Sequence, residues 1–500
     1  MSERREGAIP ESTHHATTPA LPRSAWDAGL LEPLGVGTRA TELTSDAAWL
    51  QAMVDVELAL TRSLIDARLA PEWMGDVSDR VKDAASLDLA AIAAEGRGGG
   101  NPVIPLVKHL GAAAESVRAG SSDHIHVGAT SQDILDTATM VIASRVAGEV
   151  RRQLAALADA LAGLADSHRS TVMAGRTLGQ QASPTSFGLL AAGWLDAVLR
   201  AGERLDAARA ALPVQLGGAV GNLAVLTDIV RARRAETEPN AVVGDVLAGF
   251  AARLGLAEPA LSWHTDRLVI SELASVLAGA TSVAGAFALD VTVLARTEIA
   301  EVGELLGSGQ GGSSAMPHKR NPVTAVLVAA AARRVPGLVA TLYGSMLAED
   351  QRPSGAWHAE WQALRELERL TISAVTGAAS LAERLIVDDD RMRANLDITD
   401  GLVFSERVTT ILAEALGKTA AFDLVTRASS ESVNTSRPLQ VVLAGALAST
   451  GASEDLRRQI WAAFDYSGDL GQADAGIDRV LEKYRGRRAR TENTESGHPS

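Results

Sequence analysis

Two glycines, two hydroxyls, an amide and several basic side chains lie close together in the string GGSSAMPHKRN, residues 311–321. The string has no hydrophobic period, so it is not typical of a core segment. Glycines let a backbone turn sharply and bring its N–H groups close to an anion. A serine beside such donors, with a lysine six residues further on, can take a proton from carbon while the donors hold the resulting charge. The alternative is a Gly/Ser loop that ends at a proline turn and does no chemistry.

A second polar string, HIHVGATSQDILDT, covers residues 124–137. Gly128 permits a turn, and Thr130 and Ser131 stand where a long helical pattern begins, which suits a helix N-cap. The same hydroxyls and helix-start amides can bind a carboxylate. His126 is either a structural histidine or a contact to the same anion.

Further strings carry residues suited to anion binding. GRTLGQQASP at 175–184 contains Arg176, and RPSGAWHAEW at 352–361 begins with Arg352. Each arginine is either a surface residue or a contact to an anionic ligand, because a guanidinium matches the geometry of a carboxylate. The glycine-rich QLGGAVGN at 215–222 is a third such segment.

These strings resemble those of a known family. The string at 311–323 closely resembles the signature loop of the aspartase/fumarase superfamily, whose members add or remove groups across a C–C bond next to a carboxylate. The string at 124–137 resembles the superfamily's H-x-G-x-T-S-x-D motif. The segments at 215–222 and 352–361 are similar to those of the 3-carboxy-cis,cis-muconate cycloisomerase branch. The resemblance runs from about residue 30 to about residue 430, and so covers most of the chain.

The resemblance implies a role for each matching residue. Ser313 takes the place of the family's base, while Lys319 and Asn321 take the place of its carboxylate binders. The pair Thr130 and Ser131 corresponds to residues that hold a substrate carboxylate. Additional substrate contacts are expected at His126, Arg176, Thr177, Gln180, Gln215 and Arg352, and supporting roles at Ser314, Met316 and His358.

Leu178 is the departure from the superfamily pattern that discriminates best between reactions. In lyases such as adenylosuccinate lyase the corresponding position holds a histidine that is linked to protonation of the leaving group, and leucine cannot donate a proton. Expulsion of an amine or hydroxide requires such an acid, whereas nitrite and carboxylates leave as stable anions. The substitution argues against adenylosuccinate, argininosuccinate, aspartate and malate as substrates. His126 or His358 is an alternative source of the proton.

Two reactions then suit this branch. One is β-elimination from a substituted succinate, with nitrosuccinate giving fumarate and nitrite in natural-product biosynthesis. The other is the lactonising cycloisomerisation of a carboxymuconate in aromatic catabolism. The whole chain, with its long polar N-terminal extension, resembles nitrosuccinate lyases, which favours the first. An adenylosuccinate lyase-type enzyme and a catalytically inactive structural relative are the remaining alternatives.

Helices must position these strings. The composition is 46% hydrophobic but only 3% aromatic, and alanine and leucine dominate, which favours close-packed helices. We expect an all-α fold of three helical domains with a central long-helix bundle, in a superfamily that forms homotetramers with active sites shared between protomers. The expected parts are a disordered tail at 1–25, helical domains at 26–136, 137–388 and 389–484, and a disordered tail at 485–500. Helical patterns lie at 138–166, 186–211, 221–255 with a break near 238–240, 264–307, 322–348 and after Trp357.

Composition also excludes several function classes. The net charge of -14 argues against general nucleic-acid binding but permits a local basic site for a dicarboxylate. The chain has no cysteine, which rules out disulfides and thiolate catalysis. There is no metal-binding motif and no cofactor fingerprint, so neither is expected. No apolar run approaches about 18 uninterrupted residues, so we expect a cytoplasmic protein that does not span a membrane.

Overall fold

A computed structural model describes residues 29–496, apart from 235, 308–310, 313–315, 317, 449–451 and 466–469. The chain is predominantly helical, which confirms the expected all-α class. Strands within these described residues are short and form two antiparallel pairs, β1–β2 and β3–β4. Ser313 and Ser314, assigned from the signature loop, lie outside the described residues.

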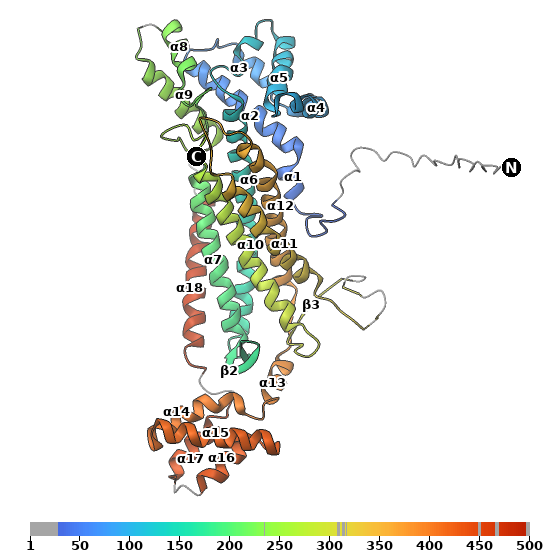
Figure 1. Ribbon diagram of the computed structural model, residues 1–500, viewed down its shortest axis with the longest axis vertical. Coiled ribbons are helices and arrows are strands. Elements are labelled where there is room, and N and C mark those ends of the chain that lie inside the picture. The colour runs from blue at the N-terminus through green and yellow to red at the C-terminus, as the bar shows by residue number, and fades with distance from the viewer. Residues whose placement is uncertain are drawn as a thin grey trace, which may run out of the picture.

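The N-terminal part is a cluster of helices at one end of an elongated molecule (Figure 1). Its longest helix, α2, starts at Asp46 because the hydroxyl of Ser45 accepts the N–H of Ala48 and caps the first turn. The helices are α1 (Ala40–Thr44), α2 (Asp46–Asp66), α3 (Met74–Val81), α4 (Leu89–Gly99) and α5 (Val103–Val117), with short 3-10 turns at Ala84–Ser86 and Ser122–His124.

The central bundle runs along the long axis of the molecule (Figure 1). Its members are α6 (Ser131–Ser167), α7 (Phe187–Ala210), α10 (Leu268–Leu294), α11 (Val323–Gly344) and α12 (Ala356–Glu383). Val146, Val150 and Leu154 on α6 are buried at four-residue steps, as the sequence pattern predicts. One hydrophobic core joins this bundle to the N-terminal helices, so no boundary in packing separates them near residue 137.

The expected helix at 221–255 is two helices, as its predicted break requires. They are α8 (Ala224–Arg233) and α9 (Pro239–Leu254), and Pro239 stands in the first turn of α9, where a missing N–H costs nothing. The expected helix at 264–307 is shorter, because α10 ends at Leu294. Ala300 then adopts a left-handed backbone (φ 53°), which a helix cannot continue through.

Helices α10 and α11 are long and apolar enough, by length and composition alone, to cross a membrane. Both nevertheless pack within the bundle, against each other and against α12. Their most apolar windows are only 44% and 28% buried in a single chain. Large apolar side chains on these helices, including Leu289, Val326 and Tyr343, therefore face outward.

Two strand pairs tie the lower end of the bundle together. A two-residue turn joins β1 (Val172–Thr177) to β2 (Gln180–Ser186) in a hairpin just beyond the end of α6. The other pair, β3 (Val302–Glu304) and β4 (Leu385–Val387), joins the segment after α10 to the segment after α12. The signature loop lies between β3 and α11.

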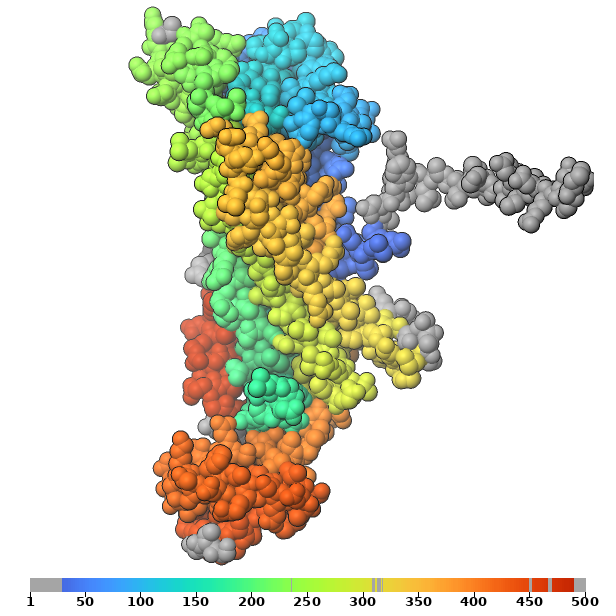
Figure 2. All heavy atoms as spheres, viewed as in Figure 1, coloured from blue at the N-terminus to red at the C-terminus, as the bar shows by residue number. Residues whose placement is uncertain are grey.

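The C-terminal helices form a separate small core below the bundle, which Figure 2 displays as a globular end. They are α13 (Asp389–Asp397), α14 (Ser405–Leu416), α15 (Lys418–Thr435), α16 (Leu439–Ala448) and α17 (Glu454–Ala462), with a 3-10 turn at Leu402–Phe404.

The last helix, α18 (Ala473–Ser496), departs from the expected domain plan. It returns along the bundle and packs on α7 and α6, and its Ile477 and Leu481 are buried in the main core. Residues 485–496 are therefore helical, not a disordered tail. The physical reason is anchorage: Arg487 donates to the carbonyl of Leu199 and pairs with Glu203.

Candidate active site

The start of α6 is built from a tight turn. His126 and Gly128 both have left-handed backbones, with φ of 61° and 76°, and Thr130 then serves as the N-cap residue. The N–H of Thr130 donates to Asp133 Oδ2 at 2.9 Å, which fixes the first turn of the helix. Thr130 and Ser131 are thereby placed at a helix N-terminus, where N–H groups and the helix dipole favour an anion.

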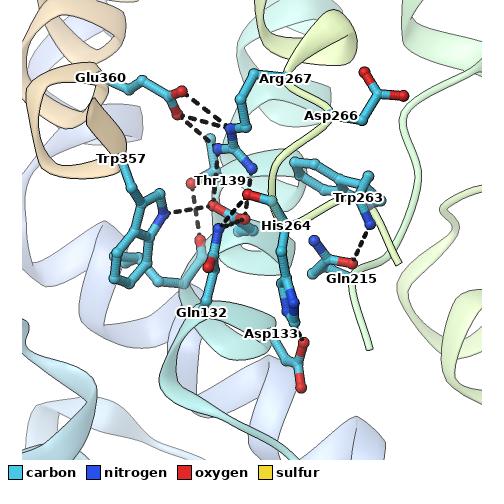
Figure 3. A network of polar contacts seen from close by, with 12 residues as sticks. Gln132, Asp133, Thr139, Gln215, Trp263, His264, Asp266, Arg267, Trp357 and Glu360 are labelled. Atoms are coloured by element: carbon cyan, nitrogen blue, oxygen red, sulfur yellow. Dashed lines mark hydrogen bonds and ion pairs between the residues drawn. The ribbon is translucent and has the colours of Figure 1, made fainter. Parts of the chain in front are cut away.

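Asp133 holds this helix start against two distant segments. Its side chain is fully buried and accepts the N–H groups of Gly217 at 3.0 Å and Gly218 at 2.9 Å. Nε2 of His264 lies 2.7 Å from Oδ1 of the same carboxylate, in the network drawn in Figure 3. One buried carboxylate thus joins the 124–137 string, the glycine-rich 215–222 segment and the loop before α10.

Arg352 brings the 352–361 string to the same place. Its Nη2 donates to Thr130 Oγ1 at 2.9 Å and its Nε to Gln132 Oε1 at 3.1 Å. Nη1 of Arg352 has no hydrogen-bond partner among the described residues. Three strings that are far apart in sequence therefore meet at the N-terminus of α6 within one chain.

A buried ion network lies beneath this surface. Arg267 donates to Asp136 at 2.7 and 3.1 Å and to Glu360 at 2.6, 3.0 and 3.2 Å, while Trp357 Nε1 donates to Asp136 at 2.9 Å. Figure 3 shows Arg267 facing Glu360, with the Trp357 indole on the same side. Burial raises the pKa of Glu360, and the charge of Asp136 adds to this although Arg267 opposes it. Burial alone would lower the pKa of Arg267, but Asp136 and Glu360 outweigh it and raise that pKa.

One expected substrate contact, Gln215, and one residue with an expected supporting role, His358, have other side chains of the chain as neighbours. Gln215 is fully buried; its Oε1 accepts the N–H of Trp263 at 3.0 Å, and its backbone exchanges hydrogen bonds with Thr137. His358 is exposed and its ring lies 4.7 Å from that of Trp361. The substrate contact of Gln215 and the supporting role of His358 stay predictions.

The hairpin places the third string at the far end of α6. Thr177 and Gln180 pair across its tip and are exposed, and Leu178 between them is fully exposed with φ of 51°. Arg176 faces inward instead: its Nη atoms donate to the buried Glu301 at 2.6 and 2.9 Å. Arg176 is therefore paired within the chain, and its expected contact with substrate stays a prediction.

Hydrogen bonds between Gly311 and Asn321 close the base of the signature loop. The backbone N–H and the side-chain amide of Asn321 both donate to the carbonyl of Gly311, at 3.0 and 3.3 Å. Met316 and Lys319 are exposed on the loop, and the N–H of Lys319 donates to the carbonyl of Met316 at 3.1 Å. Lys319 is thus available to a ligand that approaches from outside the chain.

Comparison with known proteins identifies the family. A family model described as a lyase matches residues 44–337. The chain belongs to this family. It is 44% identical over 460 residues to a nitrosuccinate lyase of Streptomyces davaonensis, covering 91% of the chain and 94% of that protein. It is 39% identical over 443 residues to a 3-carboxy-cis,cis-muconate cycloisomerase of Pseudomonas aeruginosa, covering 88% and 93%.

A solved structure agrees with this placement. The crystal structure of the 3-carboxy-cis,cis-muconate lactonizing enzyme from Pseudomonas putida superposes with a TM-score of 0.79 at 35% identity, covering 89% of this chain and 96% of that one. The chain is a lyase of the aspartase/fumarase superfamily, in its cycloisomerase-like branch. The family resemblance of the sequence strings is thus confirmed, and with it the class of enzyme.

Within one chain of this lyase, the expected site residues lie at the two opposite ends of α6. Helix α6 has 37 residues, so at 1.5 Å per residue it separates Thr130 from the hairpin by about 55 Å. The Thr130, Ser131 and Arg352 cluster lies at one end, and Leu178 lies at the other. The signature loop is attached to the strand pair β3–β4, near the hairpin end (Figure 1).

Three buried residues near the first end were not predicted from the sequence: Glu57, which contacts His126, and His264 and Arg267, which contact α6. A signal for Glu57 existed, since it is an acidic residue in the apolar run VDVELAL, residues 54–60, at a position that the helical pattern buries. His264 and Arg267 lie in the string WHTDR at 263–267, which has no periodicity that could distinguish a buried arginine from an exposed one. Their partners on α6 and α12 became visible only in the structure.

Proposed function

We propose that this lyase eliminates nitrite from nitrosuccinate to give fumarate, in natural-product biosynthesis in the cytoplasm. A base removes the proton from the carbon next to one carboxylate, and that electron pair forms an aci-carboxylate. The C–C double bond then forms as the C–N bond breaks, and its electron pair leaves with nitrite. Neither step requires a metal or an organic cofactor.

The roles in this proposal follow the family strings. Ser313 is the base, and Lys319 and Asn321 bind the carboxylate on which charge develops. Thr130, Ser131 and Nη1 of Arg352, which has no partner within the described chain, bind the other carboxylate, because a helix N-terminus and a guanidinium donor converge there.

The presence of leucine at position 178 is the observation that supports a leaving group that needs no proton. Leu178 is fully exposed at the hairpin tip, held there by a strained left-handed turn, in the position where related lyases carry an acidic histidine. An apolar side chain there suits a group that departs as a stable anion without a proton. The 44% identity with a nitrosuccinate lyase supports the same substrate.

We further propose that the protein is a homotetramer with active sites shared between protomers. The strings that must act together lie about 55 Å apart along α6 in one chain, so other copies must supply the missing parts. The exposed apolar faces of α10 and α11 offer a surface for such assembly, since a monomer rarely leaves so much apolar surface in water.

The substrate is tested by offering nitrosuccinate and 3-carboxy-cis,cis-muconate separately to the purified protein. The proposal expects stoichiometric nitrite and fumarate from the first and no ultraviolet change with the second. Ser313→Ala is expected to abolish nitrite release while the far-ultraviolet circular dichroism and thermal midpoint stay unchanged. Near-normal turnover by Ser313→Ala would remove Ser313 from the role of base.

Shared sites are tested by mixing two inactive variants. Ser313→Ala and Arg352→Ala, unfolded and refolded together, are expected to regain part of the nitrite-releasing activity, because some sites in a mixed tetramer contain neither change. No recovery in a mixed oligomer confirmed by native mass spectrometry would contradict sites built from several chains.

Carboxymuconate cycloisomerisation is the second candidate. It is favoured by the 39% identity with a cycloisomerase and by the superposition on a lactonizing enzyme. Lactonisation adds a carboxylate across a double bond, so it also needs no acid for a leaving group and is equally compatible with Leu178. The two substrates offered separately distinguish the candidates.

A further inference from the structure

Glu57 on α2 makes a close pair with His126 in the turn before α6. Nδ1 of the imidazole lies 2.7 Å from Oε1 of the carboxylate. The Glu57 side chain is 0% exposed and that of His126 is 21% exposed. The second carboxylate oxygen of Glu57 is buried without a hydrogen-bond partner in the described chain. The pair thus joins a fully buried carboxylate to an imidazole that still reaches the surface.

The charges around His126 favour its protonated form. A buried carboxylate is costly unless a cation lies beside it, and the imidazole is the group in contact with Glu57. Burial alone would lower the pKa of His126, but the hydrogen bond and charge of Glu57, together with the charge of Asp133 on α6, raise it above its usual value. Both charged groups that act on the ring, one from each helix packed against it, are acidic.

The backbone adds a second reason for the pairing. A histidine with φ of 61° is strained by roughly 1–2 kcal/mol relative to a right-handed conformation, so a specific contact must hold it. The contact with Glu57 is that restraint. It joins α2 to the turn that precedes Thr130, the N-cap residue of α6, by four residues.

We propose that Glu57 is a positioning residue that keeps His126 as an imidazolium beside the Thr130–Ser131 anion site, where it holds a third negative charge. This inference rests on the proposed function. Nitrosuccinate enters as a dianion. Once the base has taken the proton from carbon and the C–N bond has broken, the two products carry three negative charges, two on fumarate and one on nitrite. The tricarboxylate of the second candidate reaction carries the same number. A fixed imidazolium stabilises that third charge in either case.

The inference is tested by calorimetric binding of succinate, a dianion, and tricarballylate, a trianion, between pH 7 and pH 9. Wild type is expected to bind tricarballylate more tightly than succinate, with an advantage that shrinks as pH rises through the pKa of His126. In Glu57→Gln, tricarballylate affinity at pH 7 falls about tenfold or more while succinate affinity changes much less, because one charged contact is lost. His126→Gln gives the same result and serves if Glu57→Gln does not fold.

Glu95→Gln is the matched control. Glu95 on α4 pairs with His109 on α5 at 3.2 Å, the same kind of pair outside the candidate site. Glu95→Gln should leave the affinities for succinate and for tricarballylate unchanged. If Glu57→Gln weakens succinate and tricarballylate equally, or the advantage of tricarballylate does not depend on pH, Glu57 only supports the fold and the inference is wrong. If wild type binds neither acid, the proposed dicarboxylate site is itself wrong.

Discussion

Asp133→Asn tests the role of the carboxylate that joins the start of α6 to the glycine-rich segment. Each of its oxygens has two donors: Gly217 N–H and His264 Nε2 at Oδ1, and Thr130 N–H and Gly218 N–H at Oδ2. An asparagine keeps one oxygen and replaces the other with an NH₂ group. With the NH₂ group at the Oδ2 position, the N–H groups of Thr130 and Gly218 both lose their acceptor. With the NH₂ group at the Oδ1 position, the N–H of Gly217 loses its acceptor, and His264 can accept only by moving its proton to Nδ1, which is buried without a partner in the described chain. Two of the four hydrogen bonds to the charged carboxylate are therefore lost in either orientation.

The size of the effect follows from that count. Hydrogen bonds to a charged group contribute roughly 1.5–3 kcal/mol each, so two lost bonds amount to about 3–6 kcal/mol. Relief from burying a carboxylate offsets part of this, and we expect a net loss of about 3 kcal/mol. The turn that carries Thr130 should also shift, which raises KM for the dicarboxylate by tenfold or more.

The loss of stability is measured by denaturant unfolding at one protomer concentration, with tryptophan fluorescence as the signal. The rise in KM is measured from the rate of nitrite release. Asp228→Asn removes an exposed pair with Arg231 and should change neither by a measurable amount. If Asp133→Asn unfolds within about 1 kcal/mol of wild type and retains its KM, the carboxylate is not the organising group and the reasoning fails.

Three other changes test separate groups. Lys319→Ala should lower kcat/KM for nitrosuccinate more than tenfold because a cation near the developing charge is lost; an unchanged kcat/KM in steady-state assays would exclude Lys319 from the site. Leu178→Ala should keep kcat within about tenfold of wild type, since loss of a general acid typically costs 10²–10⁴-fold; a larger fall would give Leu178 another role. Glu368 is buried on α12, neither of its oxygens has a hydrogen-bond partner among the residues that the structure describes, and burial raises its pKa to about 8. Its pKa in the folded state exceeds its pKa in the unfolded state, so the stability of the wild type falls as pH rises from the unfolded value towards 8. Glu368→Gln should therefore be more stable than wild type by about 2–4 kcal/mol at pH 8 but not at pH 4.5, as measured by thermal or denaturant unfolding.

Periodicity predicted the long helices well because their buried faces repeat every three or four residues. The pattern from 138 to 166 lies within α6, and the break predicted near 238–240 is the gap before Pro239 of α9. The end of α10 was predicted too late, since residues 295–307 stay rich in side chains that a helix accepts. What ends the helix there is tertiary: β3 pairs with β4, a partner that lies about 80 residues further along the chain.

The site was predictable only in part, for the same reason. The helix start at Thr130 and Ser131 was predicted because capping preferences are local and can be read from neighbouring residues; their contact with substrate stays a prediction. The final helix was not, because α18 is fixed by Arg487 reaching Leu199 and Glu203 on α7, almost 290 residues earlier. Ser313 and Ser314 rest on motif resemblance alone.

Arg176 and Arg352 show the limit of reading a site from motifs. Both stand inside family strings, so the sequence gives each the same expected contact with an anion. In the fold, both Nη atoms of Arg176 donate to the buried Glu301. Arg352 instead donates to neutral acceptors, on Thr130, Gln132 and Ala219, and its Nη1 has no partner within the described chain. A guanidinium already neutralised by a buried carboxylate has little attraction left for a second one, while a guanidinium bound to neutral oxygens keeps its charge for the substrate. Arg352 is therefore the stronger candidate for the substrate carboxylate. The pair of Arg176 with Glu301 joins the hairpin to the residue before β3, and a substrate contact by Arg176 stays a prediction.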